Sequence, residues 1–126
     1  MPSPRVLIVD DEPHILLILE KVLQKYGCET VKAESGEVAL KALKGGQFDV
    51  VILDLMMPSV SGIEVCRHIR NNPDTKSQPV VILTADHDER DKETCVNMGI
   101  EDYITKPFSP KKLAERIGEI LEKYSI

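Results

Sequence analysis

The segment Val6-Leu7-Ile8-Val9-Asp10-Asp11-Glu12 places an uninterrupted apolar run directly before three acidic residues. Two similar runs follow, Val50-Val51-Ile52-Leu53 and Val80-Val81-Ile82-Leu83, and they are followed by Asp54 and Thr84. Apolar β-branched runs that are continuous rather than alternating are typical of strands buried on both faces, as in a parallel sheet covered by helices. The three runs therefore predict the centre of a parallel sheet, with a polar residue at the end of each strand.

Two weaker strands are expected at the edges of this sheet. Thr30-Val31-Lys32-Ala33 alternates in polarity and Tyr103-Ile104-Thr105 is short, and both suit edges where one side meets solvent. With the first, third and fourth strands in the centre and right-handed crossovers between them, the strand order is 2-1-3-4-5. The predicted fold class is α/β, a (βα)5 doubly wound, five-stranded parallel sheet of the flavodoxin-like kind.

Helices are expected between the strands. The ranges are 15–26, 37–44, 61–70 and 88–98, and a fifth helix begins at Ser109-Pro110. The first helix is expected to bury Ile15, Ile18, Leu19, Val22, Leu23 and Tyr26, and to end at Gly27. The fifth is expected to bury Leu113, Ile117, Ile120, Leu121 and Tyr124. Ser35 suits a helix cap and Ser61 with Glu64 a capping box, while the fourth helix has only a thin apolar face.

Length and composition fit one soluble domain. The chain has 126 residues, 42% hydrophobic and 29% charged, and no apolar stretch approaches the ~18 residues of a membrane helix. We therefore expect a single domain over residues 1–126, located in the cytoplasm. The net charge of −5, without a basic stripe, argues against direct nucleic-acid binding. Cys28, Cys66 and Cys95 form no close pair and are expected to be reduced core residues.

Polar residues are expected to meet at one edge of the sheet. Parallel strands bring their carboxyl ends together there, and ligands of such folds bind at that edge. The residues concerned are Asp10, Asp11, Asp54, Thr84 and Lys106. Carboxylates within ~4 Å repel by ~1–4 kcal/mol, and a hard cation such as Mg²⁺ offsets this repulsion. Since aspartate can form an aspartyl-phosphate and lysine and threonine can bind phosphoryl oxygens, the set predicts a phosphoryl-accepting carboxylate.

Several segments, taken in order, resemble one known family. They are 6–12, 51–58 followed by Ser61-Gly62, 81–85, and the Asp102-Tyr103-Ile104-Thr105-Lys106-Pro107-Phe108 segment. Over roughly Arg5 to Tyr124, the chain resembles the receiver domains of two-component response regulators, the CheY-like family. The resemblance implies a signalling domain that is switched by phosphorylation of an aspartate.

The resemblance also implies a role for each site residue. Asp54 would accept the phosphoryl group of a phosphohistidine, carried by a sensor histidine kinase or a histidine phosphotransfer protein. Thr84 and Lys106 would bind the phosphoryl oxygens. The implied ligands of Mg²⁺, for which Mn²⁺ can substitute, are Asp11, Asp54, the backbone carbonyl of Met56 and, through water, Asp10.

The same resemblance implies a switch and its partners. Thr84 and Tyr103 are the implied switch residues, and they are expected to alter the surface of the fourth helix, fifth strand and fifth helix. That surface would control an output protein or a fused output domain.

The Lys106-Pro107 bond is one that the family usually holds cis. Activity is expected to stop at self-catalysed phosphoryl acceptance and autodephosphorylation, so the chain is not expected to be an enzyme. Leu17, flanked by Leu16, is a candidate for kinase docking.

Three other interpretations fit the sequence less well. A flavodoxin-like redox protein needs a hydroxyl- or glycine-rich phosphate loop after the first strand, where this chain has Asp10-Asp11-Glu12-Pro13. A haloacid-dehalogenase-type phosphatase expects a second aspartate two residues after the nucleophile, where this chain has Met56. A degenerate receiver that acts as a phosphorylation-independent protein-interaction scaffold is disfavoured because all the chemical positions are present.

Overall fold

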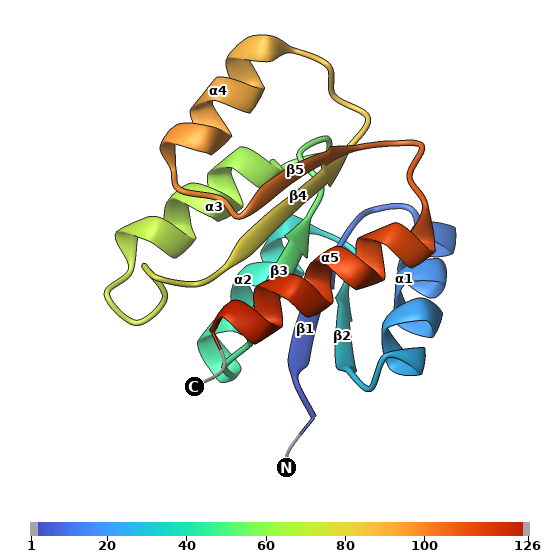
Figure 1. Cartoon of the computed structure of the whole chain (residues 1–126). Helices are drawn as coiled ribbons and strands as arrows, with labels where there is room; N and C mark the ends of the chain where they lie inside the picture. Colours follow the sequence, from blue (N-terminus) through green and yellow to red (C-terminus); the bar gives the residue numbers. More distant parts are fainter. Residues whose placement is uncertain (1–2, 125–126) are drawn as a thin grey trace.

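The computed structural model describes residues 3–124 as five strands and five helices that alternate along the chain (Figure 1). The strands are β1 (Arg5–Val9), β2 (Glu29–Ala33), β3 (Val50–Leu53), β4 (Val80–Thr84) and β5 (Asp102–Thr105). The helices are α1 (Pro13–Lys25), α2 (Gly36–Gly45), α3 (Gly62–Asn71), α4 (Glu89–Asn97) and α5 (Pro110–Lys123). Within this described part of the chain, no helix is both long enough and apolar enough to cross a membrane.

The five strands form one parallel sheet in the predicted order, β2-β1-β3-β4-β5. The apolar runs of β1, β3 and β4 are almost entirely buried, whereas the edge strands β2 and β5 are partly exposed. In the register of the central strands, Val9 lies beside Leu53 and Leu53 beside Ile82. The strands therefore end close together, and the residues that follow them meet at one edge.

Helices cover both faces of the sheet, α1 and α5 on one side and α2, α3 and α4 on the other (Figure 1). The side chains of β1 alternate between the two layers. Ile8 packs with α1 and α5, whereas Leu7 packs with α2 and α3. Each such burial contributes ~1.5–3 kcal/mol, so the central strands are held firmly from both sides. The three cysteines are buried and free, as predicted.

Local capping interactions set where several helices begin and end. Ser35 accepts a hydrogen bond from the amide of Val38 at 3.2 Å, and Ser61 and Glu64 form the predicted capping box. Gly27 follows α1 with a φ of 85°, the left-handed region that favours glycine. These signals are local in sequence, which is why the sequence predicts them.

The predicted buried stripes of two helices are partly wrong. Leu16 is buried at 4% exposure and takes an inward position with Leu19 and Leu23, whereas Ile18 is 38% exposed. Leu19 lies three residues after Leu16, and Leu23 lies four residues after Leu19, so these three side chains share one face of the helix and Ile18 is turned toward solvent. Tyr26 and Tyr124 are about half exposed because each lies at the C-terminal cap, beyond the last helical residue.

Candidate functional site

Backbone hydrogen bonds place the predicted site residues at the carboxyl edge of the sheet. The amide of Asp10 donates to Ala33 at 3.1 Å, that of Asp54 to Val9 at 3.0 Å, and that of Lys106 to Thr84 at 2.8 Å. These bonds continue the parallel ladders just past the ends of β1, β3 and β5. The side chains of Asp10, Asp54 and Lys106 are therefore directed by the sheet itself rather than by flexible loops.

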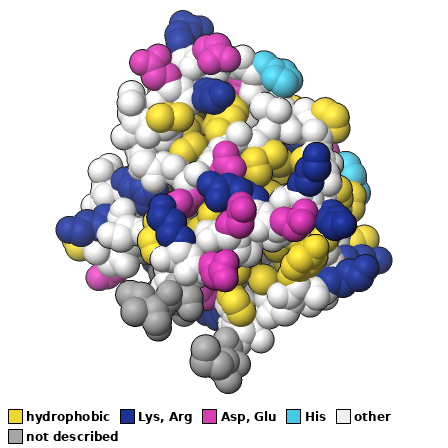
Figure 2. Space-filling view, viewed as in Figure 1, with side chains coloured by type: hydrophobic (Ala, Val, Ile, Leu, Met, Phe, Trp, Pro, Cys, Tyr) yellow, Lys and Arg dark blue, Asp and Glu magenta, His cyan; other side chains and the backbone are white. Residues whose placement is uncertain are grey.

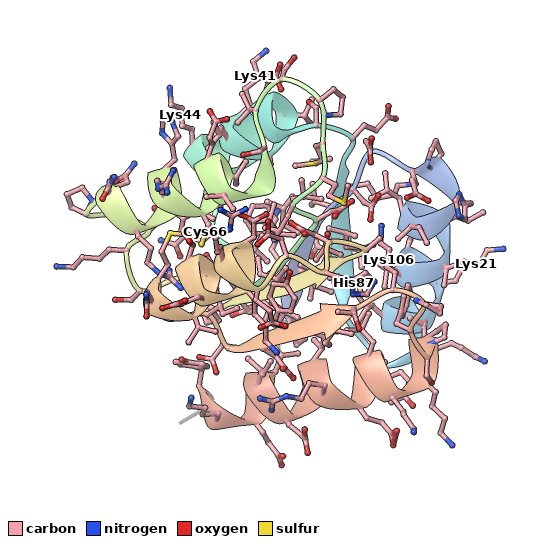
Figure 3. All side chains as sticks on the ribbon, turned by 90° about the horizontal axis from the view of Figure 1, so that it is seen from above. Lys21, Lys41, Lys44, Cys66, His87 and Lys106 are labelled. Carbon is pink, nitrogen blue, oxygen red and sulfur yellow. The ribbon has the colours of Figure 1, made fainter. Side chains whose placement is uncertain are left out.

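The ammonium group of Lys106 lies among three carboxylates. Its Nζ is 2.8 Å from Oδ2 of Asp10, 3.4 Å from Oδ2 of Asp54 and 3.5 Å from Oε1 of Glu12. Asp10 and Asp54 are almost completely buried, and the Lys106 side chain is only 11% exposed. Figure 3 shows Lys106 between the sheet and α1, over this edge. The Lys106-Pro107 bond is cis, as predicted.

The burial of these charges shifts the pKa values of two of them. Desolvation raises the pKa of the Asp10 carboxyl above its ordinary value, against the lowering effect of the hydrogen bond from Lys106. The charge of Asp54 raises the same pKa further. Burial alone would lower the pKa of Lys106, but the hydrogen bond to Asp10 and the charges of Asp54 and Glu12 raise it. The site thus holds more negative charge than one ammonium neutralises.

An acidic cluster beside Lys106 could hold a metal ion. Carboxylate oxygens of Asp10, Asp11 and Glu12 can be chosen that all lie within 4.8 Å of one another. Asp10 is buried, whereas Asp11 is exposed. Carboxylate oxygens are the ligands of hard cations such as Mg²⁺. The cluster fits such an ion, and the excess of negative charge provides the electrostatic reason to bind it.

Glu12 is also part of this site, although its place in the sequence did not predict a specific role for it. Besides its ion pair with Lys106, its amide donates a hydrogen bond of 2.9 Å to Oδ1 of Asp10. Its carboxylate is also 3.4 Å from Nε2 of His14. Its position in an acidic run directly after a strand was the only sequence signal that pointed to it.

The start of α3 packs tightly against the loop that carries Asp54. The amide of Gly62 donates to the carbonyl of Leu55 at 3.1 Å, and the amide of Met56 donates to Oδ1 of Asp54 at 3.2 Å. A Cβ atom on Gly62 would lie 2.1 Å from the Asp54 carbonyl oxygen and 2.6 Å from the Leu55 Cα. Only glycine fits there, a constraint that the capping pattern alone did not reveal.

Thr84 and Tyr103 are linked through Asp86, at the start of the segment between β4 and α4. The amide of Asp86 donates to Oγ1 of Thr84 at 3.2 Å, and the hydroxyl of Tyr103 donates to the Asp86 carbonyl at 3.1 Å. Thr84 is fully buried and Tyr103 partly so. Burial raises the pKa of Tyr103 to about 12, with a further contribution from the charge of Asp86. The two predicted switch residues thus hold the same backbone segment.

A family model of the response regulator receiver domain matches residues 6–118, most of the chain. The chain belongs to the response regulator receiver family. The resemblance seen in the sequence is therefore confirmed, and this receiver domain is a phosphorylation-accepting signalling domain. The scaffold-only interpretation is not favoured.

Related proteins include two bacterial transcriptional regulators. The receiver domain is 39% identical over 121 residues to the phosphate regulon transcriptional regulatory protein PhoB of Escherichia coli, covering 96% of this chain and 53% of PhoB. It is 38% identical over 124 residues to the alkaline phosphatase synthesis transcriptional regulatory protein PhoP of Bacillus subtilis, covering 98% of this chain and 51% of PhoP. The chain thus spans about half the length of these curated relatives.

Solved receiver domains share the fold. The signal receiver domain of a signal transduction histidine kinase from Syntrophus aciditrophicus is similar at a TM-score of 0.89 and 31% identity. The alignment covers 98% of this chain and 93% of that one. The predicted sheet order and helix arrangement are therefore those of the receiver family.

Proposed function

We propose that Asp54 is the phosphoacceptor and that its phosphoryl group comes from a phosphohistidine of a sensor histidine kinase or a histidine phosphotransfer protein. The observation that carries this proposal is the position of Asp54. Its carboxylate is 3% exposed, lies at the end of the central strand β3, and is 3.4 Å from the ammonium of Lys106. A carboxylate placed beside a fixed ammonium and an acidic cluster suits phosphoryl acceptance.

The proposed step is a displacement at phosphorus. A lone pair of an Asp54 carboxylate oxygen forms the new oxygen–phosphorus bond, while the phosphorus–nitrogen bond of phosphohistidine breaks and its electron pair returns to the imidazole. Lys106 provides positive charge for the phosphoryl oxygens, and the Thr84 hydroxyl donates a hydrogen bond to them. Positioning and charge stabilisation supply most of the catalysis in such transfers.

The acidic cluster would bind the Mg²⁺ ion that is typical of the family, with Mn²⁺ as a substitute. The proposed ligands are Asp11, Asp54 and the Met56 carbonyl, with Asp10 acting through water. Bound Mg²⁺ would offset the charge of the phosphoryl oxygens. In support, Asp10 carries a raised pKa and lies in the acidic cluster, while Met56 already contacts Asp54 through its amide. Asp11→Ala is expected to weaken Mg²⁺ binding more than Asp10→Ala, as measured by calorimetric titration.

The proposed output of phosphorylation is a change at the surface formed by α4, β5 and α5. Thr84 turns toward the phosphoryl group and draws Asp86 with it, and Tyr103 loses or changes its contact with Asp86. The hydrogen bonds of both residues to Asp86 support this coupling. The partner is an output protein or an output domain of a longer protein. We propose no separate enzymatic activity beyond phosphoryl acceptance and autodephosphorylation.

Residues 1–126 would act as one receiver domain in the cytoplasm, with no direct contact to nucleic acid or membrane. In support, the net charge is −5. On the face seen in Figure 2, acidic and basic side chains are interspersed. Neither feature favours the polyanionic surface of nucleic acid or of an acidic membrane.

Acetyl phosphate and Mg²⁺ provide the test, because they require no kinase. Intact-protein mass spectrometry should show one added phosphoryl group, with acetate as the leaving group. Asp54→Asn should abolish the adduct, whereas Asp74→Asn, an exposed position in the segment between α3 and β4, should label like the wild type. Labelling of Asp54→Asn at the wild-type rate would show that another residue is the acceptor.

A further inference from the structure

Arg70, near the end of α3, binds four backbone carbonyl groups at once. Its Nε donates to Met98 at 2.6 Å and its Nη2 to Gly99 at 3.2 Å. Its Nη1 donates to Gln78 at 2.8 Å and to Lys76 at 3.2 Å. Among the ion pairs found between residues 3 and 124, none involves Arg70. This guanidinium group is therefore committed to backbone, not to a carboxylate.

Two of these carbonyls belong to the C-terminal end of α4. Met98 is the C-terminal cap of α4, and Gly99 follows it with a φ of 73°. The last carbonyls of a helix lack partners within the helix, and a cation at that end is favourable. Arg70 supplies both the donors and the charge, and it joins this end to α3 and to the segment before β4. In Figure 1 α4 stands next to α3.

The N-terminal end of α4 is held differently. Its cap, Asp88, is exposed, and it is tied to the core through Asp86, whose amide and carbonyl bind Thr84 and Tyr103. The only α4 residue that is fully buried is Cys95, in the C-terminal half of the helix. The C-terminal end of α4 is therefore held by Arg70 and by the buried Cys95, whereas the N-terminal end is held through contacts with the proposed switch residues Thr84 and Tyr103.

We infer that Arg70 fixes the C-terminal end of α4 as a hinge, so that phosphorylation moves the N-terminal half, residues 88–92, about Met98 and Gly99. The movement rests on the proposed function, but the hinge is a property of the unphosphorylated domain. Arg70 contacts the segment that precedes β4, at the amino end of the strands, so its substitution should leave the chemistry at Asp54 intact.

Hydrogen exchange of the unphosphorylated domain tests the hinge by itself. In Arg70→Met, the amides of residues 95–99 should exchange about tenfold faster or more, because their end of the helix loses its support. Arg67→Met, an exposed position on the same helix, should leave them unchanged. Arg70→Lys keeps the charge but not the planar set of donors, so it should restore protection only in part. Unchanged exchange in both Arg70 variants would overturn the hinge, whatever happens at Asp54.

The beryllofluoride adduct, a phosphoryl mimic, tests the movement. In the wild type with Mg²⁺, exchange should change at residues 88–92 and not at 97–99, and the Cys95 thiol should stay inert to iodoacetamide. In Arg70→Met the adduct should expose Cys95, with peptide mass spectrometry identifying the alkylated residue. Two results would overturn the inference. One is an equal change in hydrogen exchange along all of α4 in the wild-type adduct, and the other is no change in exchange at α4 although the adduct has formed. Failure of Asp54 to accept a phosphoryl group would instead overturn the proposed function. It would leave the hinge tested, because the first experiment uses the unphosphorylated domain.

Discussion

The ammonium of Lys106 is bound to Asp10, with 2.8 Å between Nζ and Oδ2, rather than centred on the proposed phosphoacceptor Asp54, which lies 3.4 Å away. The lysine therefore neutralises part of the charge of the acidic cluster. We propose that a divalent cation bound at the acidic cluster would compete with this ammonium for the same negative charge. We expect Lys106 to turn from Asp10 toward the phosphoryl oxygens when Asp54 accepts the phosphoryl group.

Lys106→Met should separate the two roles of this lysine. Removing a positive charge near the cation site should tighten Mg²⁺ binding by about fivefold, or roughly 1 kcal/mol. Labelling by acetyl phosphate should nevertheless become slower, because the phosphoryl oxygens lose their ammonium. Calorimetric titration and mass spectrometry give the two quantities, with Lys111→Met, an exposed lysine, as the control. Weaker Mg²⁺ binding in Lys106→Met would contradict the proposed competition.

Gly62→Ala should destabilise the domain and disturb Asp54. The added Cβ would lie 2.1 Å from the Asp54 carbonyl oxygen, so the backbone must shift, at a cost of ~1–3 kcal/mol. Urea unfolding should show this loss, and labelling of Asp54 should slow. Gly118→Ala is the matched control, because a Cβ there meets nothing within 4 Å and the position lies inside α5. That variant should gain ~0.5–1 kcal/mol. A Gly62→Ala variant as stable as the wild type would refute the close contact.

The phenol of Tyr103 should lose its proton at a higher pH than an ordinary tyrosine. The stability of the domain should therefore depend on pH in the alkaline range. Its pKa is raised from 10.0 to about 12 in the folded domain, first through burial and then through the charge of Asp86. Between these values the unfolded chain loses the phenolic proton while the folded domain keeps it. Stability should therefore fall as pH rises through this interval.

Tyrosinate absorbance, read directly after a pH jump, measures this pKa. The wild-type curve minus that of Tyr103→Phe isolates one tyrosine, and its midpoint should lie at about 12. Tyr103→Phe should also lose part of the alkaline fall in stability. A difference curve with its midpoint at 10.0, the ordinary value, would show that Tyr103 is not held as the structure indicates.

Leu17→Ser should slow phosphotransfer from the kinase by about tenfold, because it removes a contact with the kinase, while leaving acetyl phosphate labelling unchanged. Leu17 is 45% exposed and its neighbour Ile18 is 38% exposed, whereas Leu16, expected to flank Leu17 at the docking site, is buried and not available to a partner. Val38→Ser is the control, since Val38 is 46% exposed on α2. Loss of both activities, or of neither, in Leu17→Ser would argue against docking through this residue.

Local patterns in the sequence were enough to predict the strands, several helix caps and the edge where the site lies. Continuous apolar runs demand burial on both faces, and Ser61 with Glu64 caps its helix through contacts three residues apart. Such signals are local, so they can be read without knowing the fold. The order of the strands followed from which runs were most apolar. The family motifs added the roles proposed for the residues at that edge.

Which of these residues contact one another became known from the folded arrangement alone. Lys106 lies 96 positions from Asp10 and 52 from Asp54, and Arg70 lies 28 from Met98. No periodicity or cap relates residues so far apart, because their distances depend on strand register and on how the helices pack. Gly62 was likewise recognisable as a helix start but not as the point where α3 meets the Asp54 backbone. The ion pairs of Lys106, the close contact of Gly62 and the proposed hinge at Arg70 all depend on how the helices pack on the two faces of the sheet.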